Sequence, residues 1–173
     1  LHASSQDRKI ATSQDSAMDN VTAKILSLSS LSSGLYNKDF LLTWQYSEPA
    51  IRAVLLAAEI LEDLAASNIS TRVFDTGLGI SIFRDKSTRT RYAFRSGCNL
   101  LGLMTEELDE STSQIAHGET VRETAAMISF LTEVIGIRDD MYLGEGNTYM
   151  REVGRAVQEG FERGVLHQRP CVI

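Results

Sequence analysis

The sequence predicts a soluble α/β domain in which a parallel sheet is flanked by helices on both faces. Short apolar segments bounded by glycine or by polar loops are typical of buried strands, and segments with apolar residues at helical spacing separate them. The two kinds of segment alternate along the chain. Alternation favours parallel strands, because a crossover helix returns the chain to the end of the sheet where the next strand begins.

The first 38 residues predict a polar extension that precedes the domain. Residues 1–17 are serine-rich and show no hydrophobic period, whereas apolar side chains recur at helical spacing from Met18 onward and indicate a short helix. We expect one globular domain over residues 39–173, since 173 residues with 43% hydrophobic content are enough to bury a single core.

Capping signals and hydrophobic period set the order of the later elements. Ser47 is a predicted N-cap with Pro49 in the first turn, and the apolar face of that helix runs to Ala65. The remaining predictions are a strand at Gly77–Phe83, a polar loop at Arg84–Arg91, a helix at Arg91–Leu101 ended by Gly102, a strand at Leu103–Leu108, a loop at Asp109–Gly118, a helix at Thr120–Val134, a strand at Ile135–Arg138, a helix at Asn147–Phe161, a loop at Gly164–Pro170 and a strand at Cys171–Ile173.

Composition limits the classes of function. The formal net charge of -6 argues against a general nucleic-acid binder, because phosphate-backbone affinity requires a clustered cationic face. Cys98 and Cys171 lack CxxC spacing, so neither a disulfide framework nor a metal site is expected. The sequence contains no apolar run long enough for a membrane span and opens without the apolar core of a secretory signal. We therefore expect a cytoplasmic protein without a membrane partner.

The polar segment Ser87–Arg91 carries the clearest chemical signal. It lies where a predicted strand meets a helix, and a helix N-terminus offers unpaired N–H groups and the positive end of the helix dipole to an anion. The hydroxyl groups can donate to phosphate oxygens, and Arg89 can supply a bidentate pair of donors. The alternative is that the hydroxyls only cap the helix while the arginines are solvated.

Residues Phe83–Arg91 resemble the carbamoyl-phosphate signature of the aspartate/ornithine carbamoyltransferase family, Phe-x-x-x-Ser-x-Arg-Thr-Arg. Residues Ser113–Glu119 and Glu123–Ala125 are similar to the family's polar loop and following helix, nearest to the ornithine branch. The resemblance covers residues 39–173. It includes Arg138 at a strand end where the family has an arginine, although the two aspartates after it depart from the usual neighbours.

This resemblance implies site residues. Ser87, Thr88, Arg89 and Thr90 match the residues that hold the phosphate group, and Arg138 completes the carbamoyl-phosphate site. Thr90 and Arg138 also match residues that face the carbonyl oxygen of the carbamoyl group, so the catalytic candidates are Arg89, Thr90 and Arg138. Donors aimed at that oxygen stabilise the charge that develops on it when an amine attacks. No cofactor is implied.

The polar loop implies an assembly. Gln114 matches a residue that reaches into the neighbouring subunit's site, which implies a homotrimer, and His117 is a further candidate in the same loop. The alternative is a plain solvent loop, since a lone loop histidine is more often a surface group than a catalyst. The acidic pairs Asp109–Glu110 and Asp139–Asp140 are interpreted as solvated loop acids rather than a metal or acid-base site.

Residues Met141–Gly144 and Tyr149–Val153 resemble a subgroup, the knotted carbamoyltransferases. The resemblance implies a one-carbon transferase of amino acid metabolism that moves a carbamoyl group from carbamoyl phosphate to an amino or ureido acceptor, or runs the reverse phosphorolysis. We expect the family's second, acceptor-binding domain to be absent from this chain, so its own activity stays open. The alternative is a truncated, non-catalytic paralogue that keeps the trimer surface and the phosphate site.

Overall fold

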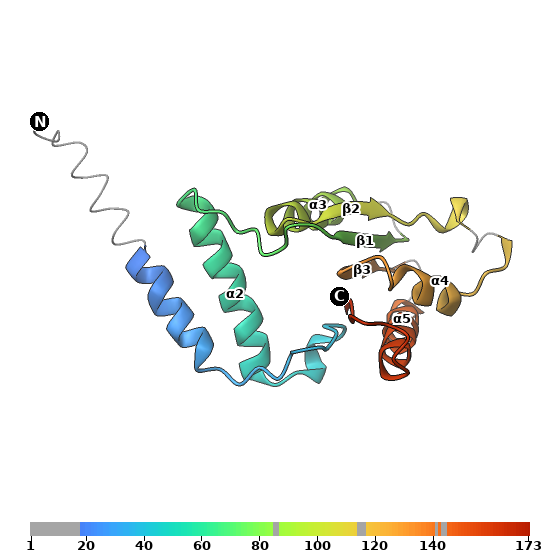
Figure 1. The fold of residues 1–173 in the computed structure, drawn as a ribbon, viewed down its shortest axis with the longest axis horizontal. Helices are drawn as coiled ribbons and strands as arrows, with labels where there is room; N and C mark the ends of the chain where they lie inside the picture. The colour runs from blue at the N-terminus through green and yellow to red at the C-terminus, as the bar shows by residue number, and fades with distance from the viewer. Residues whose placement is uncertain (1–17, 85–86, 114–116, 141, 143–144) are drawn as a thin grey trace, which may run out of the picture. The chain divides into compact units, whose positions relative to one another are not determined.

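The computed structural model describes residues 18–84, 87–113, 117–140, 142 and 145–173 (Figure 1). The chain divides into two compact units, one of Leu1–Leu35 with Leu42–Thr71 and one of Tyr36–Leu41 with Arg72–Ile173. The domain boundary predicted at residue 38 stays a prediction.

The first unit is helical in the part that the structure describes. Residues 18–29 form a helix, and a short 3-10 turn, η1 (Thr43–Gln45), precedes the long helix α2 (Glu48–Ala66). The Ser47 side chain accepts a hydrogen bond from the Ala50 N–H at 3.4 Å, and proline stands in the first turn. The predicted N-cap of α2 is confirmed.

The second unit contains the sheet. Strands β1 (Leu78–Phe83), β2 (Met104–Glu107), β3 (Val134–Arg138) and β4 (Cys171–Val172) are all parallel and lie in the order β2-β1-β3-β4. The segments that connect these strands contain α3 (Thr88–Leu101), the short 3-10 turn η2 (Glu110–Thr112), α4 (Val121–Ile128) and α5 (Glu145–Glu162). The predicted parallel α/β fold is confirmed.

Helices cover both faces of this sheet, as predicted (Figure 1). One face presents the isoleucine pairs of β1 and β3, which share a buried core with residues of α4 and α5. On the other face, Gly79 and Gly136 lie directly against Phe94 of α3, whose ring also meets the ring of Phe83 edge-on at a centroid distance of 5.7 Å. The two glycines remove the side chains that would otherwise hold α3 away from the sheet.

The helix predicted at Thr120–Val134 is wrong beyond Ile128, where α4 ends. Its start is correct, because Thr120 and Glu123 form a reciprocal capping box. After Ile128 the chain forms hydrogen bonds with the sheet instead of continuing the helix. The Glu133 N–H and the Thr132 hydroxyl both donate to the Leu78 carbonyl of β1. A hydrophobic period alone does not reveal this competition for hydrogen bonds.

Replacing Gly136 with alanine tests the close contact between α3 and the sheet. A Cβ atom at residue 136 overlaps the Phe94 ring, so we expect the free energy of unfolding to fall by about 1–3 kcal/mol. Gly97→Ala is the matched control, because a Cβ there meets nothing within 4 Å. In a helix interior this control should gain about 0.5–1 kcal/mol. Urea unfolding of both variants measures the difference, and equal effects would contradict the packing described.

Candidate functional site

The carboxyl ends of β1 and β3 mark the point where the connections of the sheet diverge. After β1 the chain enters α3 on one face and continues to β2, whereas after β3 it enters α5 and continues to β4 on the other side. Ligands of open α/β sheets bind outside the carboxyl ends of the strands at such a switch point. The topology therefore places the candidate site at the ends of these two strands.

The first turn of α3 lies at this switch point. Ser87 is the N-cap residue, yet its side chain makes no capping hydrogen bond to the backbone. Its hydroxyl instead lies 3.0 Å from the Thr90 hydroxyl. The Arg91 N–H is bonded to the Ser87 carbonyl, so the N–H groups before Arg91 are the ones that a helix leaves without internal acceptors. With no acidic residue in this turn, the end of the helix stays electropositive.

Arg138 reaches this turn from the end of β3. Its Nη1 atom donates to the Thr90 Oγ1 atom at 2.6 Å, although the two residues are 48 positions apart in the sequence. Its Nη2 atom pairs with Asp140 at 2.8 Å. Because Thr90 accepts from a guanidinium group, its own hydroxyl proton is left to donate to Ser87 or to a ligand, and the chain of hydrogen bonds polarises that proton.

The other predicted residues have different surroundings. Thr88 and Arg89 are exposed in the first turn of α3, and His117 is exposed in its loop. Arg91 has a structural role, since its Nη2 atom donates to the Phe83 carbonyl at 2.9 Å and its Nη1 atom pairs with Glu107 of β2. Gln114 lies outside the described residues, as do Asp85 and Lys86 of the motif and residues 141, 143 and 144 of the subgroup signature.

A second group of interacting side chains, the Arg84 cluster, consists of Arg84, Glu110, Asp139 and Tyr149. Arg84 pairs with Glu110 at 3.0 Å and with Asp139 at 2.6 Å, and its guanidinium carbon lies 4.8 Å from the centroid of the Tyr149 ring. The Tyr149 hydroxyl donates to Glu110 at 2.8 Å. Burial, followed by this hydrogen bond, raises the pKa of Tyr149 well above its ordinary value, so the phenol stays a neutral donor.

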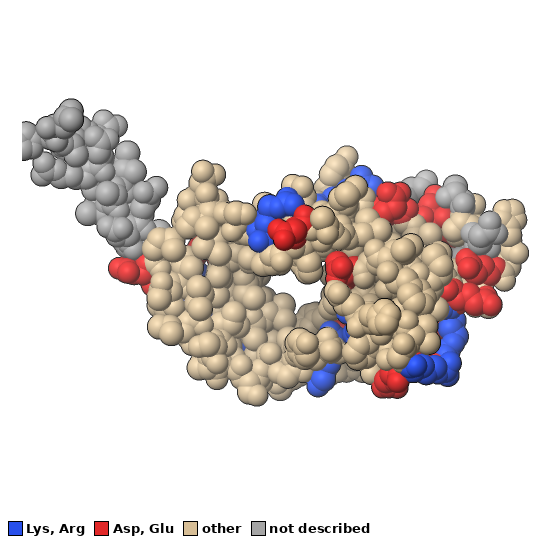
Figure 2. Space-filling view, viewed as in Figure 1, with Lys and Arg blue, Asp and Glu red and all other residues tan. Residues whose placement is uncertain are grey.

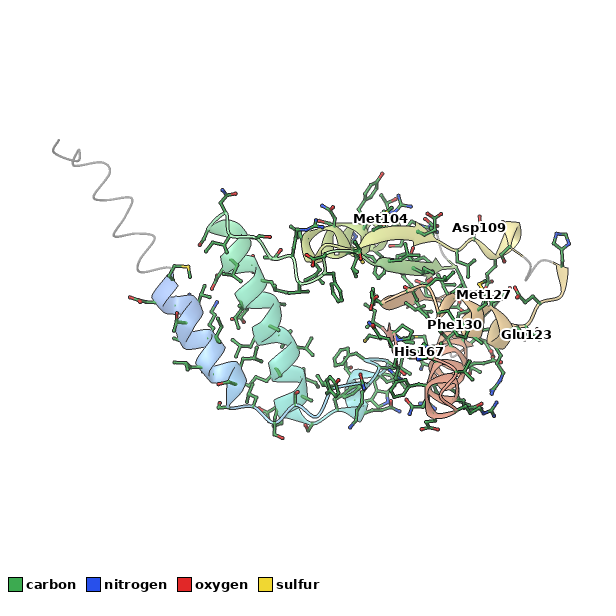
Figure 3. All side chains as sticks on the ribbon, in the orientation of Figure 1. Met104, Asp109, Glu123, Met127, Phe130 and His167 are labelled. Carbon is green, nitrogen blue, oxygen red and sulfur yellow. The ribbon has the colours of Figure 1, made fainter. Side chains whose placement is uncertain are left out.

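Local sequence patterns do not reveal this cluster, and the predicted solvation of two of its acids is wrong. These acids are Glu110 and Asp139: the side chain of Asp139 is only 1% exposed, and both carboxylates are paired with Arg84. Asp109 and Asp140 are exposed, and Asp109, which follows β2 (Figure 3), accepts from the backbone and hydroxyl of Ser111. These hydrogen bonds lower the pKa of Asp109.

Three further observations concern surface charge, possible metal ligands and possible membrane spans. On the face drawn in Figure 2, the described acidic and basic side chains are interspersed, and the basic ones do not form a continuous cationic surface there. Among the residues that the structure describes, no group of three or more histidine, cysteine or acidic side chains has an arrangement that could hold a metal ion. Within that same part of the chain, no helix combines the length and apolar character needed to cross a membrane.

The geometry defines a class of protein, an α/β domain whose candidate site lies at the carboxyl ends of parallel strands. Residues 38–158 match the family model for the carbamoyl-P binding domain of aspartate/ornithine carbamoyltransferases. The chain belongs to this family, as its motif predicted.

Proteins of similar sequence support this family assignment. The chain is 58% identical over 156 residues to YgeW of Escherichia coli (strain K12), a provisionally named carbamoyltransferase, covering 90% of this chain and 39% of YgeW. It is 36% identical over 104 residues to the ornithine carbamoyltransferase of Bacillus subtilis (strain 168), covering 60% of this chain and 31% of that enzyme. The chain therefore spans less than half the length of these relatives.

Solved structures share the fold. Aspartate transcarbamoylase from Trypanosoma cruzi, in complex with N-(phosphonacetyl)-L-aspartic acid, superposes with a TM-score of 0.63 at 18% identity, over 82% of this chain and 39% of that one. Ornithine carbamoyltransferase from Pyrococcus furiosus gives a TM-score of 0.64 at 21% identity, over 80% and 39% of the two chains. At these identities the likeness concerns the fold.

Tyr149→Phe tests the cohesion of the Arg84 cluster. The substitution keeps the ring beneath Arg84 but removes the donor to Glu110, so the free energy of unfolding should fall by about 1–2 kcal/mol. Tyr92→Phe on the exposed side of α3 is the control, with an expected change below about 0.5 kcal/mol. Thermal or urea unfolding of the two variants gives the comparison; a Tyr149→Phe protein as stable as the control would show that the hydrogen bond contributes nothing.

Proposed function

We propose that this chain is the carbamoyl-phosphate half of a carbamoyltransferase, and that its site lies between the first turn of α3 and the end of β3. The observation that carries the proposal is the 2.6 Å contact between Arg138 and Thr90 at the electropositive end of α3. A phosphate group fits the helix terminus, and the adjacent pair of donors fits a neighbouring carbonyl oxygen.

Each site residue then has a distinct task. The N–H groups of the first turn, the hydroxyls of Ser87 and Thr88 and the guanidinium group of Arg89 bind the phosphate oxygens. Thr90 and Arg138 donate to the carbamoyl oxygen. When an amine nitrogen attacks the carbonyl carbon, negative charge develops on that oxygen, and the two fixed donors stabilise the transition state more than the ground state. The bond from the carbonyl carbon to the phosphate oxygen then breaks, and phosphate leaves with the proton that the attacking nitrogen releases.

The acceptor and the assembly are parts of the same proposal. An amino or ureido acceptor would be held by a second domain, and the reverse phosphorolysis would use the same contacts. Three copies of the chain would form a homotrimer in the cytoplasm, with Gln114 of each copy reaching a neighbouring site and His117 beside it. Membership of the carbamoyltransferase family supports this arrangement.

Calorimetric titration with carbamoyl phosphate tests the site. We expect saturable binding that weakens by about 10- to 100-fold in Arg89→Ala, because a charged hydrogen bond contributes about 1.5–3 kcal/mol. Arg95→Ala is the matched control, since Arg95 lies further along α3 and pairs with Glu107 at 3.2 Å. A folded chain that does not bind, or equal losses in both variants, would refute the proposed site.

Mixed assembly tests the shared site. If Gln114 acts across a subunit boundary, co-refolding Arg89→Ala chains with Gln114→Ala chains should restore some sites to the wild-type affinity. Such sites combine Arg89 from one chain with Gln114 from another, whereas each variant alone has none. Sedimentation measures the trimer, and calorimetry counts the restored sites. Monomeric chains, or mixtures no better than the two separate variants, would favour a solvent loop.

A further inference from the structure

We propose that Arg84 is a positioning residue that sets the location of Arg138. This inference rests on the proposed function, because the position of Arg138 matters through its contact with the carbamoyl oxygen. Within the described part of the chain, Arg84 bonds to Glu110, Asp139 and the Arg138 carbonyl, and not to Thr90. It therefore acts on the strand end from which Arg138 extends.

Arg84 holds β3 at two adjacent points. Its backbone N–H donates to the Arg138 carbonyl at 3.0 Å, which continues the β1–β3 hydrogen bonding beyond the paired residues Phe83 and Arg138. Its Nη1 atom donates to the Asp139 carboxylate at 2.6 Å. Arg84 thus bonds both to the carbonyl of Arg138 and to the side chain of Asp139. These contacts fix the peptide bond that joins the two residues, and the orientation of that peptide bond directs the Arg138 side chain.

The rest of the cluster keeps Arg84 itself in place. Glu110 accepts from the Nε atom, the Tyr149 ring lies beneath the guanidinium plane, and the Tyr149 hydroxyl donates to the second oxygen of Glu110. The side chain of Asp139 is almost fully buried, so losing its cationic partner would leave a desolvated charge. A planar guanidinium group suits this place because it bonds two carboxylates at fixed angles, which a lysine ammonium does not.

Carbamoyl phosphate and inorganic phosphate should respond differently to a shift of Arg138. Carbamoyl phosphate has the carbonyl oxygen that Arg138 is proposed to contact, whereas inorganic phosphate does not. A shift of Arg138 should therefore weaken binding of carbamoyl phosphate and largely spare binding of phosphate at the first turn of α3. General damage to the fold would weaken both ligands together.

The experiment measures the dissociation constants of both ligands for the wild type, Arg84→Met, Arg138→Met and the double variant. We expect Arg84→Met to weaken carbamoyl phosphate about tenfold and phosphate less than about twofold. Because Arg84 acts through Arg138, the double variant should bind no more weakly than Arg138→Met alone. Arg122→Met is the control, since it removes another ion-paired arginine, the partner of Glu159, and should leave both constants unchanged.

Three results would overturn the inference: unchanged binding in Arg84→Met, equal losses for the two ligands, or additive losses in the double variant. If circular dichroism shows that Arg84→Met does not fold, Asp139→Asn replaces it, because it removes the carboxylate charge at nearly constant volume and must give the same selective loss. Failure of the wild type to bind carbamoyl phosphate would instead overturn the proposed function, and the inference with it.

Discussion

The pairing of the parallel strands β1 and β3 is the constraint on which the rest of the second unit depends. Their register sets Phe83 beside Arg138, so the two strands end at the same level. From those ends the chain continues to helices on opposite faces of the sheet. A strand-end arginine and a helix N-terminus consequently meet at one place, although the sequence separates them.

Close packing of α3 on the sheet determines how near the N-terminus of α3 lies to the Arg138 side chain. At Gly79 an added Cβ would lie 2.7 Å from the Cys98 sulfur, and at Gly136 it would enter the space of Phe94. Helix and strands approach each other because neither strand presents a side chain there. The first turn of α3 is thereby held against the end of β3, within reach of the Arg138 side chain.

The two arginines at the strand ends differ in how their charge is used. Arg84 is paired with Glu110 and with the buried Asp139, on the side of the sheet that α5 covers. Arg138 extends toward α3, where it donates to a neutral hydroxyl as well as to the exposed Asp140. The Asp139 side chain is only 1% exposed, so its charge depends on the ion pair with Arg84 to offset desolvation. The guanidinium group of Arg138 can also donate a hydrogen bond to a ligand beside Thr90.

The sequence by itself determined the fold class, the order of strands and helices, the α2 cap and the family, because hydrophobic period, capping and a nine-residue motif are local signals. Tertiary structure decided the early end of α4, the close approach of Phe94 to the glycines and the burial of Asp139. It also brought Thr90 to Arg138. These features depend on which segments become neighbours in space, and pairing between distant residues leaves no mark in local spacing.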